Sequence, residues 1–470
     1  MKKGALYALP LVLLVWASQN RGVSSSGELS ILLRLRKFFL RGRHKVENFK
    51  LFAGIFIFCV SFYFILFGKQ PKSLTAIIGG SLMVLTGILD QEEALHAVGK
   101  NLEIFLLLMG LMMVVEIMSE TGIFQWAAIT VAQKAKGDPT KVLIMLSIVT
   151  AICSAFLDNV TTILLIVPMT ALLARKLELD PFPFIIVQIF ACNIGGTATM
   201  IGDPPNLIIA SMGKLDFNHF IFNLTPLVIV NMAVLIITAK LLFKKKMVVS
   251  RELRASIMDL EPNRSIKNRT LLIQSCCLFG LILIGFLTNM VTNIGLAIIS
   301  IMGSVLLLSL SKKSPEEIYK KVEWETLFFF GGLFVLVEGV DKLGIISKIG
   351  ELLVEFTEGD LELTSSVVVV LSAILSPILG SVPYTLSFSK IIASIVPDFV
   401  GNTDVLWWAL SLGACLGGNM TMVGAPANIV GVSIAGKADV HISFMDFFKY
   451  GILVVAESVI LSIVYINLRY

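Results

Sequence analysis

The chain has 470 residues, of which 56% are hydrophobic and 15% charged, against about 25% charged residues in soluble domains. A soluble core cannot absorb that much apolar surface, and the apolar runs have the length of membrane-spanning helices, so a water-soluble protein is excluded. The net charge of +5 is spread over the loops; it therefore bears on membrane orientation and does not indicate nucleic-acid binding.

The predicted elements begin with an apolar segment at 5–18, which has the features of a signal peptide or of a first membrane helix. Residues 31–50 are basic and amphipathic and predict a helix on the membrane surface. Apolar spans follow at 51–68, 73–90 and 102–119, then two shorter pieces at 141–157 and 160–174, a glycine- and proline-broken span at 184–213 and a span at 225–243.

A polar, basic linker covers 244–269, and the same order of elements then returns. The second series has spans at 271–289, 293–310 and 325–340, two pieces at 364–379 and 383–397, a broken span at 405–435 and a last span at 447–467. We therefore divide the chain into an N-terminal part (1–50), a first repeat (51–243), the linker and a second repeat (270–470).

The repeat is visible in the residues of the two broken spans. Residues 195–206 read GGTATMIGDPPN and residues 417–428 read GGNMTMVGAPAN. Seven of these twelve positions are identical, where chance would give roughly one. The same offset of 222 residues pairs Gly110 with Gly332 and Glu116 with Glu338. One offset held over such a distance indicates a duplication.

Each copy has five crossings, one of them broken, if the paired short pieces are re-entrant hairpins. An odd number predicts that the two copies have inverted topology in an all-α polytopic membrane protein. Placing the linker in the cytoplasm puts most Lys-rich loops on that side, as the positive-inside rule requires. We therefore expect a protein of the plasma (inner) membrane. Lys342, Lys348 and the basic stretch 31–50 do not follow this division.

Two kinds of place in each copy interrupt the helices at membrane depth, namely the hairpin tip and the broken span. Such breaks occur where the freed backbone groups line a cavity or are buried in protein, and transporters with inverted repeats build their ion and substrate sites there. Close helix packing is the alternative reading of the glycines. The substrate-site candidates are Thr161, Thr162, Asn193, Gly195, Gly196, Thr197, Thr199, Asn206, Gly380, Ser381, Gly417, Gly418, Asn419, Thr421 and Asn428.

Asp158 and Asp203 are the acids at these places, and with Asn159 they are the candidates for binding a proton or a coupling ion. A carboxylate inside a membrane is costly unless it is paired, hydrated or protonated, so it is a functional candidate by default. Helix capping is the alternative role for both acids, and it is the stronger alternative for Asp203 because two prolines follow it.

Glu116, Glu338 and Lys390 are further charged residues in or near the spans. The two glutamates fit interfacial positions, and Lys390 could pair with a membrane carboxylate, attract an anion or extend toward the surface. Cys153, Cys192 and Cys415 lie near the motifs; thiols bind arsenite and antimonite, although a buried cysteine more often fills space.

No metal-site spacing, P-loop, cofactor motif or catalytic triad occurs, so we predict neither an enzyme nor a bound cofactor. A separate ATPase subunit is compatible with the sequence.

The motifs FLDNVTT at 156–162, NIGGTAT at 193–199 and GDPPN at 202–206 resemble the ion transporter superfamily. The resemblance is to its citrate-transporter-like branch of arsenite and antimonite efflux permeases and the P-protein, and it covers about residues 50–467. It implies two inverted repeats with re-entrant hairpins, and a mobile transport domain that moves against a scaffold in an elevator-like manner, often in a dimer.

The second copy departs from the pattern of the P-protein relatives, which carry Asp-Asn at this hairpin tip as well. Here Gly380 and Ser381 stand opposite Asp158 and Asn159, and Ala425 stands opposite Asp203. We expect an asymmetric site in a secondary antiporter that exports a small metalloid oxyacid, arsenite or antimonite, in exchange for protons. A sodium/proton antiporter, a sodium-coupled symporter for a small anion and an anion channel are the alternatives.

Overall fold

A computed structural model describes residues 48–470. The chain divides into two compact units, residues 1–55 and 56–470. The apolar segment at 5–18 and nearly all of the basic stretch 31–50 lie outside the described residues. A helix runs from Asn48 to Phe67, and the account below concerns the unit 56–470.

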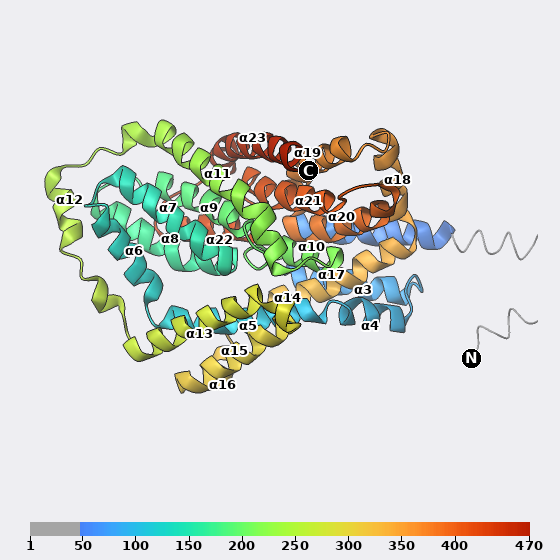
Figure 1. Ribbon diagram of the computed structural model, residues 1–470, viewed down its shortest axis with the longest axis horizontal. Helices are drawn as coiled ribbons and strands as arrows, with labels where there is room; N and C mark the ends of the chain where they lie inside the picture. The colour runs from blue at the N-terminus through green and yellow to red at the C-terminus, as the bar shows by residue number, and fades with distance from the viewer. Residues whose placement is uncertain (1–47) are drawn as a thin grey trace, which may run out of the picture. The chain divides into compact units, whose positions relative to one another are not determined.

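All regular secondary structure in the described part of the chain is helical, and it contains no strand. Eight of its helices are long and apolar enough to cross a membrane. Figure 1 shows the arrangement of the helices. The first series comprises α3 (Lys72–Leu85), α4 (Gln91–Gly99), α5 (Leu102–Glu120), α6 (Ile123–Lys134), α7 (Pro139–Phe156), α8 (Asn159–Lys176), α9 (Phe182–Gly196), α10 (Pro204–Gly213) and α11 (Phe217–Phe243).

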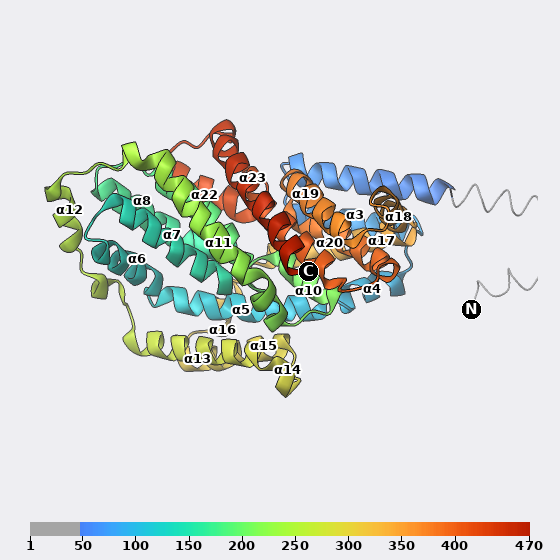
Figure 2. The same ribbon diagram turned by 45° about the horizontal axis from the view of Figure 1, so that its top comes forward.

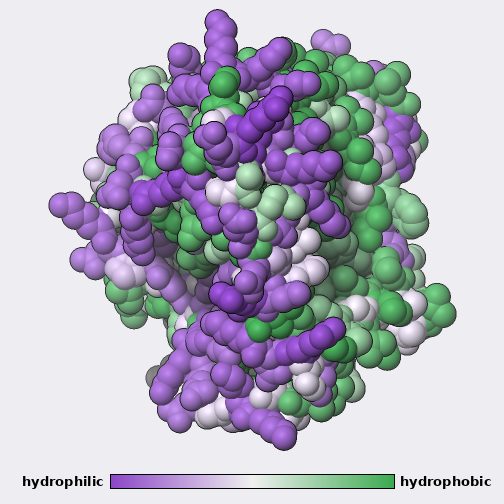
Figure 3. Space-filling view, turned by 90° about the vertical axis from the view of Figure 1, so that its left-hand side faces the viewer, coloured by the Kyte–Doolittle hydropathy of each residue, from purple (hydrophilic) through white to green (hydrophobic). Residues whose placement is uncertain are grey.

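The linker contains α12 (Arg251–Met258), and the second series follows it. Its members are α13 (Arg269–Leu287), α14 (Asn289–Thr292), α15 (Leu296–Ser311), α16 (Pro315–Tyr319), α17 (Trp324–Lys342), α18 (Ile345–Phe356), α19 (Leu361–Leu379), α20 (Ser381–Ile395), α21 (Asp404–Gly417), α22 (Pro426–Lys437) and α23 (Phe444–Arg469). Figure 3 faces the side that carries α12 and shows hydrophilic residues gathered over it, as on a surface outside the lipid.

The two series keep the offset of 222 residues in their helix boundaries. Helices α17 and α18 begin 222 residues after α5 and α6, and Gly122 and Gly344 precede α6 and α18 with φ of +85° and +74°. Asp138 and Asp360 cap α7 and α19 by accepting a backbone N–H three residues on. The same local sequence therefore builds the same local structure twice.

Helix packing follows the same correspondence and interleaves the copies. Helix α3 packs against α17, and α5 packs against α15, the counterpart of α3. Within each copy, α7 packs on α9 and α19 packs on α21. The second hairpin arm of each copy, α8 or α20, packs on the second half of the other copy's broken span, α22 or α10. Figure 2 shows α13 and α15 beside α5. The opposite membrane orientation of the copies stays a prediction.

The hairpins close at tips with different geometry. At the first tip, Leu157 and Asp158 separate α7 from α8, and the Asp158 carboxylate accepts the N–H of Thr161 at 2.9 Å. At the second tip, Gly380 alone separates α19 from α20, and its φ of +82° is strained for any side chain. Gly380 therefore replaces a capped two-residue tip with a one-residue turn.

Several helices go beyond the sequence prediction. Helices α4, α6, α12 and α18 are too short or too polar to be recognised as spans, and α11 begins at Phe217 instead of 225. The early start of α11 follows from its capping box, in which Asp216 and His219 bond each other's backbone N–H.

Candidate functional site

The break between α9 and α10 is closed by the side chain of Asn206. Its Nδ2 donates to the carbonyl oxygens of Thr197 at 3.2 Å and Thr199 at 2.9 Å. These carbonyls have no partner in a helix ladder, so the amide replaces the bonds lost where the helix unwinds. The carboxamide thereby fixes the shape of the break.

The second copy repeats this arrangement, with Asn428 and Thr421 at the positions of Asn206 and Thr199 and with Gly418 one residue before the counterpart of Thr197. Asn428 Nδ2 donates to the carbonyl oxygens of Gly418 and Thr421, both at 2.8 Å. The hydroxyl of Thr421 donates to Pro377 O at 2.8 Å, just as that of Thr199 donates to Ala155 O. Each break is thus tied to the first arm of its own hairpin.

The two copies meet at these asparagines. Asn193 Nδ2 donates to Asn428 Oδ1 and to Asn419 Oδ1, each at 2.8 Å. In the opposite direction, Ser411 Oγ donates to Asn206 Oδ1 at 2.6 Å. All of these side chains are fully buried. The structure therefore brings together Asn193, Asn206, Asn419 and Asn428 from the predicted set, and adds Ser411, which the sequence motif did not mark.

The paired glycines allow close approach of neighbouring chain segments. A Cβ on Gly195 would lie 2.2 Å from Ala151 O on α7, and one on Gly196 would lie 2.4 Å from Asn159 Oδ1. A Cβ on Gly417 would lie 2.6 Å from Ala373 Cα, whereas one on Gly418 would have its nearest neighbour at 3.5 Å. Close packing therefore accounts for Gly195 and Gly417, while Gly196 makes room for a polar group of the hairpin tip.

The two acids have different surroundings. Asp158 caps α8 and is partly exposed, so its capping role is present in the structure. Asp203 is only 3% exposed, precedes α10 and makes no capping hydrogen bond from its side chain. The side chains of Asn159 and Cys415 lie within interaction range of the Asp203 carboxylate. The sequence argument favoured capping more for Asp203 than for Asp158, and the structure reverses that order.

Several buried polar atoms of the hairpins and of α9 have no hydrogen-bond partner in the protein. They include Asn159 Nδ2, Thr162 Oγ1, Asn193 Oδ1 and Ser381 Oγ from the predicted set. Buried polar groups are normally hydrogen-bonded, so unpartnered ones indicate a ligand or water. One amide acceptor and two hydroxyls are thus free to bind a guest, while the amide of Asn159 lies beside the Asp203 carboxylate.

Gln188, Thr385 and Ser389 were not singled out from the sequence, and they too have buried side-chain atoms without a partner. Ser381, Thr385 and Ser389 follow each other at intervals of four residues, which places them on one face of α20. That spacing of hydroxyls inside an apolar helix was the signal that could have found them.

The remaining charged candidates lie apart from this cluster. Lys390 Nζ bonds Glu338 Oε2 and Asp341 Oδ2, both at 2.7 Å, and Glu338 also pairs with Lys100 at 2.8 Å. Glu116 pairs with Lys321 at 2.6 Å. Lys390 therefore joins the second hairpin to α17 by ion pairs. Its ion-pair partners are Glu338 and Asp341, and Asp158 is not one of them.

One further acid lies close enough to Asp158 to feel its charge. Glu323 stands in the loop before α17, and its carboxylate accepts the hydroxyl of Thr326 at 3.1 Å. Burial, and to a smaller extent the charge of Asp158, raise the pKa of Glu323 to about 7. The sequence analysis assigned no role to Glu323, because its approach to Asp158 depends on packing between segments far apart in the chain.

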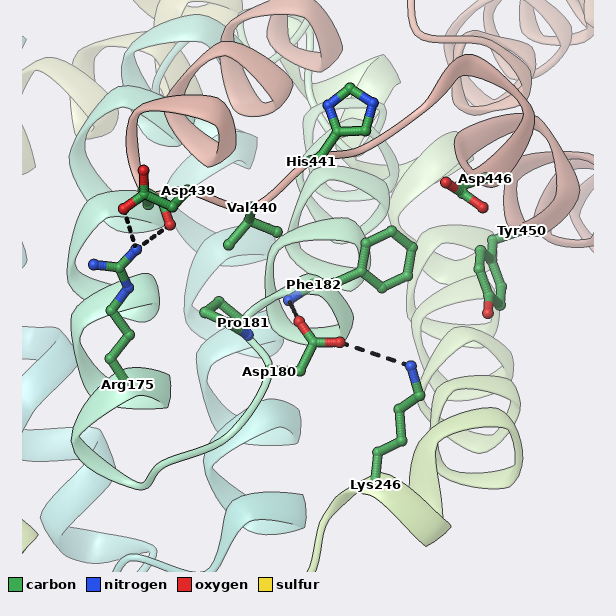
Figure 4. A pocket seen from close by; sticks show the side chains of 11 residues that line it. Arg175, Asp180, Pro181, Phe182, Lys246, Asp439, Val440, His441, Asp446 and Tyr450 are labelled. Carbon is green, nitrogen blue, oxygen red and sulfur yellow. Dashed lines mark hydrogen bonds and ion pairs between the residues drawn. The ribbon is translucent and has the colours of Figure 1, made fainter.

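A separate polar pocket of about 410 Å³ lies at the ends of α8 and α22 and the starts of α9 and α23 (Figure 4). Arg175 bonds Asp439 at 3.3 Å, and Lys246 pairs with Asp180 at 3.7 Å. None of the predicted site residues lines it. Because both of its basic side chains lie in ion pairs, this pocket is better described as a junction between segments than as an anion site.

Comparison with known proteins supports a transporter. A protein-family model described as "Citrate transporter" matches residues 62–413. The chain is 37% identical over 422 residues to a "46 kDa membrane protein" of Mycobacterium leprae, covering 89% of this chain and 98% of that one. An uncharacterized transporter of Mycobacterium tuberculosis is 35% identical with the same coverage.

The predicted resemblance to the P-protein is confirmed. The P protein of Sus scrofa is 32% identical over 496 residues, which cover 88% of this chain and 58% of that protein. Among solved structures, the YdaH transporter of Alcanivorax borkumensis matches with a TM-score of 0.49 and 12% identity, over 82% of this chain and 90% of that one.

Proposed function

Because the chain belongs to the citrate transporter family and is a membrane transporter, we propose that it exports a small metalloid hydroxide, such as arsenite, in exchange for protons. The observation that carries this proposal is the chemistry of the buried polar groups without a partner on the two hairpins and on α9. These groups are amides and hydroxyls, two acids stand beside them, and neither Lys nor Arg is among the residues that carry them.

An uncharged hydroxide matches these free groups. Its hydroxyls both donate and accept, so they suit an unpartnered donor such as Asn159 Nδ2, an acceptor such as Asn193 Oδ1 and a hydroxyl such as that of Ser381. Carboxylates are usually bound by Arg or Lys, or by backbone N–H groups at a helix N-terminus, and next to Asp158 and Asp203 a substrate carboxylate would be repelled. The buried thiols of Cys192 and Cys415 also lie in this region, and thiolates favour soft metalloids.

Proton exchange is assigned to Asp158 and Asp203. In a membrane interior a carboxylate is stable when protonated or paired, so loading and release of a proton can alternate with substrate. The acids belong to the first copy, while the second contributes Ser381, Asn419 and Asn428. The site is therefore asymmetric in charge although its backbone is duplicated.

Transport by an elevator-like movement is part of the same proposal. Helices α3, α5, α15 and α17 form cross-copy pairs that suit a scaffold, whereas the hairpins pack on the broken spans. The ion pairs of Lys390 with Glu338 and Asp341 connect these two groups of helices and must rearrange if one moves past the other. A homodimer would supply further scaffold contacts.

Carboxylate transport is the second candidate, because the matching family model is described as a citrate transporter. A carboxylate carrying a bound cation would be compatible with the acids at the site. Sodium/proton antiport, the other alternative, would use the same two acids. It differs from the proposed function in that Na⁺ or Li⁺ alone would drive proton movement.

Reconstituted liposomes separate these functions. Internal pH is recorded after addition of arsenite, antimonite, citrate with and without a divalent cation, Na⁺ or Li⁺. The proposal expects proton movement with arsenite or antimonite alone. Proton movement with Na⁺ or citrate, and none with the metalloids, would refute it in favour of the corresponding alternative.

A further inference from the structure

An apolar cavity of about 490 Å³ lies between α7, α11 and the end of α9, where the first broken span unwinds. Its lining is formed by aliphatic side chains, one phenylalanine, a methionine, a glycine and two threonines. Gly195, Ala198 and Thr199 belong both to this lining and to the motif of the break. The cavity therefore shares a wall with the candidate transport site.

The segment 195–199, which lines the cavity, makes short contacts with α7 and α11. Gly195 approaches the α7 backbone so closely that a Cβ would lie 2.2 Å from Ala151 O. On the other side, Thr225 Oγ1 of α11 donates to Ala198 O at 3.0 Å. Both threonine hydroxyls of the lining are thus engaged, since that of Thr199 bonds Ala155 O. The cavity offers its occupant no unsatisfied polar group from these residues.

The rim of the cavity faces outward along two candidate membrane spans, α7 and α11. Ile148 is 39% exposed, Ile152 57% and Ile229 64%, and all three line the cavity. On helices that span a bilayer, large exposed aliphatic side chains face lipid. The opening is therefore toward the hydrocarbon of the membrane.

We propose that this cavity binds an acyl chain of a membrane phospholipid, which inserts between α7 and α11 and rests against the segment 195–199. An empty volume of this size would deprive its aliphatic lining of contacts, because protein interiors are close-packed. The bilayer supplies chains of matching chemistry at the opening. The chain is held by shape and contact, since lipid tails and aliphatic side chains are equally apolar.

This occupant has a consequence for the neighbouring site. The inserted chain contacts the unwound segment at Ala198 and Thr199, and Asn206 holds the carbonyl oxygens of Thr197 and Thr199 in the same segment. The inference is independent of which substrate is transported, because it rests on the apolar lining of the cavity and not on the unpartnered polar groups.

Brominated lipid provides the test. The variants Ile229→Trp, at the rim of the cavity, and Ile237→Trp, exposed on the same helix but outside it, are reconstituted in vesicles of dibrominated phosphatidylcholine. Wild-type fluorescence supplies the baseline for the native tryptophans. The vesicles are then fused with a large excess of unbrominated phosphatidylcholine, and the recovery of fluorescence is followed.

We expect Ile237→Trp to recover as the lipids mix and Ile229→Trp to keep part of its quenching. Adding Ala233→Phe, which fills the cavity from α11, should remove that retained part, whereas Ile236→Leu, which nearly preserves side-chain volume in the lining, should not. Thermal unfolding of each variant confirms that it is folded. Equal recovery at positions 229 and 237, or retention that survives the filled cavity, would overturn the proposal.

Discussion

Asn193 donates a hydrogen bond of 2.8 Å to the carboxamide oxygen of Asn428, and the two residues come from different copies of the duplicated motif. Asn428 in turn holds the carbonyl oxygens of Gly418 and Thr421. The side chain that closes one copy's helix break is therefore anchored by the other copy. Because of this hydrogen bond, a change in the conformation of one helix break affects the other.

Replacing Asn428 by Ala should destabilise the protein more than replacing Asn193. Asn428→Ala removes three hydrogen bonds, namely those to Gly418 O and Thr421 O and the one accepted from Asn193, although Thr421 O keeps the N–H of Gly424. Asn193→Ala removes two, those to the carboxamide oxygens of Asn419 and Asn428. Each buried polar group left without a partner costs about 1–3 kcal/mol. Thermal unfolding in detergent measures both variants.

A double-mutant cycle supplies the control for this pair. The combined variant should lose less stability than the sum of the single losses, because the shared hydrogen bond is counted twice. Strict additivity would show that the bond contributes nothing. Asn206→Ala, the equivalent change in the other copy, should resemble Asn428→Ala.

The two candidate acids should respond differently to the same pair of substitutions. Asp158→Asn keeps the capping oxygen toward Thr161, so we expect normal stability with loss of proton-coupled flux. Asp158→Ala removes the cap as well and should cost about 0.5–2 kcal/mol in addition. Flux in liposomes and thermal unfolding are measured on the same preparations.

Asp203 makes no capping bond from its side chain, so neither Asp203→Asn nor Asp203→Ala should lose a helix cap, although Asp203→Ala also removes the contacts with Asn159 and Cys415. Both should lose coupling. If coupling persists in Asp203→Asn and disappears in Asp158→Asn, the proton site is at the hairpin tip alone. Persistence in both would remove the acids from the mechanism.

The glycine pair predicts a contrast between two Gly→Ala changes in helices. Gly195→Ala places a methyl group 2.2 Å from Ala151 O, a backbone atom, and such overpacking costs about 1–3 kcal/mol. Gly436→Ala meets nothing within 4 Å in α22 and should be neutral or slightly stabilising, since Ala is the better helix former. Similar thermal stability of the two variants would contradict the tight contact between α7 and α9.

Much of this architecture could be read from the sequence because a duplicated motif is recognisable by its spacing. The offset between Gly195 and Gly417 also fixes the equivalence of α5 with α17 and of Asp138 with Asp360. Local patterns cannot show which copy a side chain will touch. The bond from Ser411 to Asn206, and the approach of Glu323 to Asp158, depend on packing between segments far apart in the chain. Likewise, capping by Asp158 but not Asp203 follows from backbone geometry that prolines alone do not determine.

Glu323 predicts a pH dependence of stability. Its pKa is raised to about 7 in the folded protein by burial and by the charge of Asp158. Between its ordinary pKa and about 7, the folded state therefore holds a proton that the unfolded state has released. The free energy of unfolding should fall as pH rises through this range and become constant above it.

Glu323→Gln should remove this dependence, because the amide does not titrate. Glu317→Gln, on the exposed surface of α16, is the matched control and should leave it in place. Thermal unfolding between pH 4.5 and pH 8, spanning roughly the ordinary and raised values, measures the slope. A slope that is identical in Glu323→Gln and wild type would assign the titration to another group, whereas a reduced slope in Asp158→Asn would confirm that the two carboxylates interact.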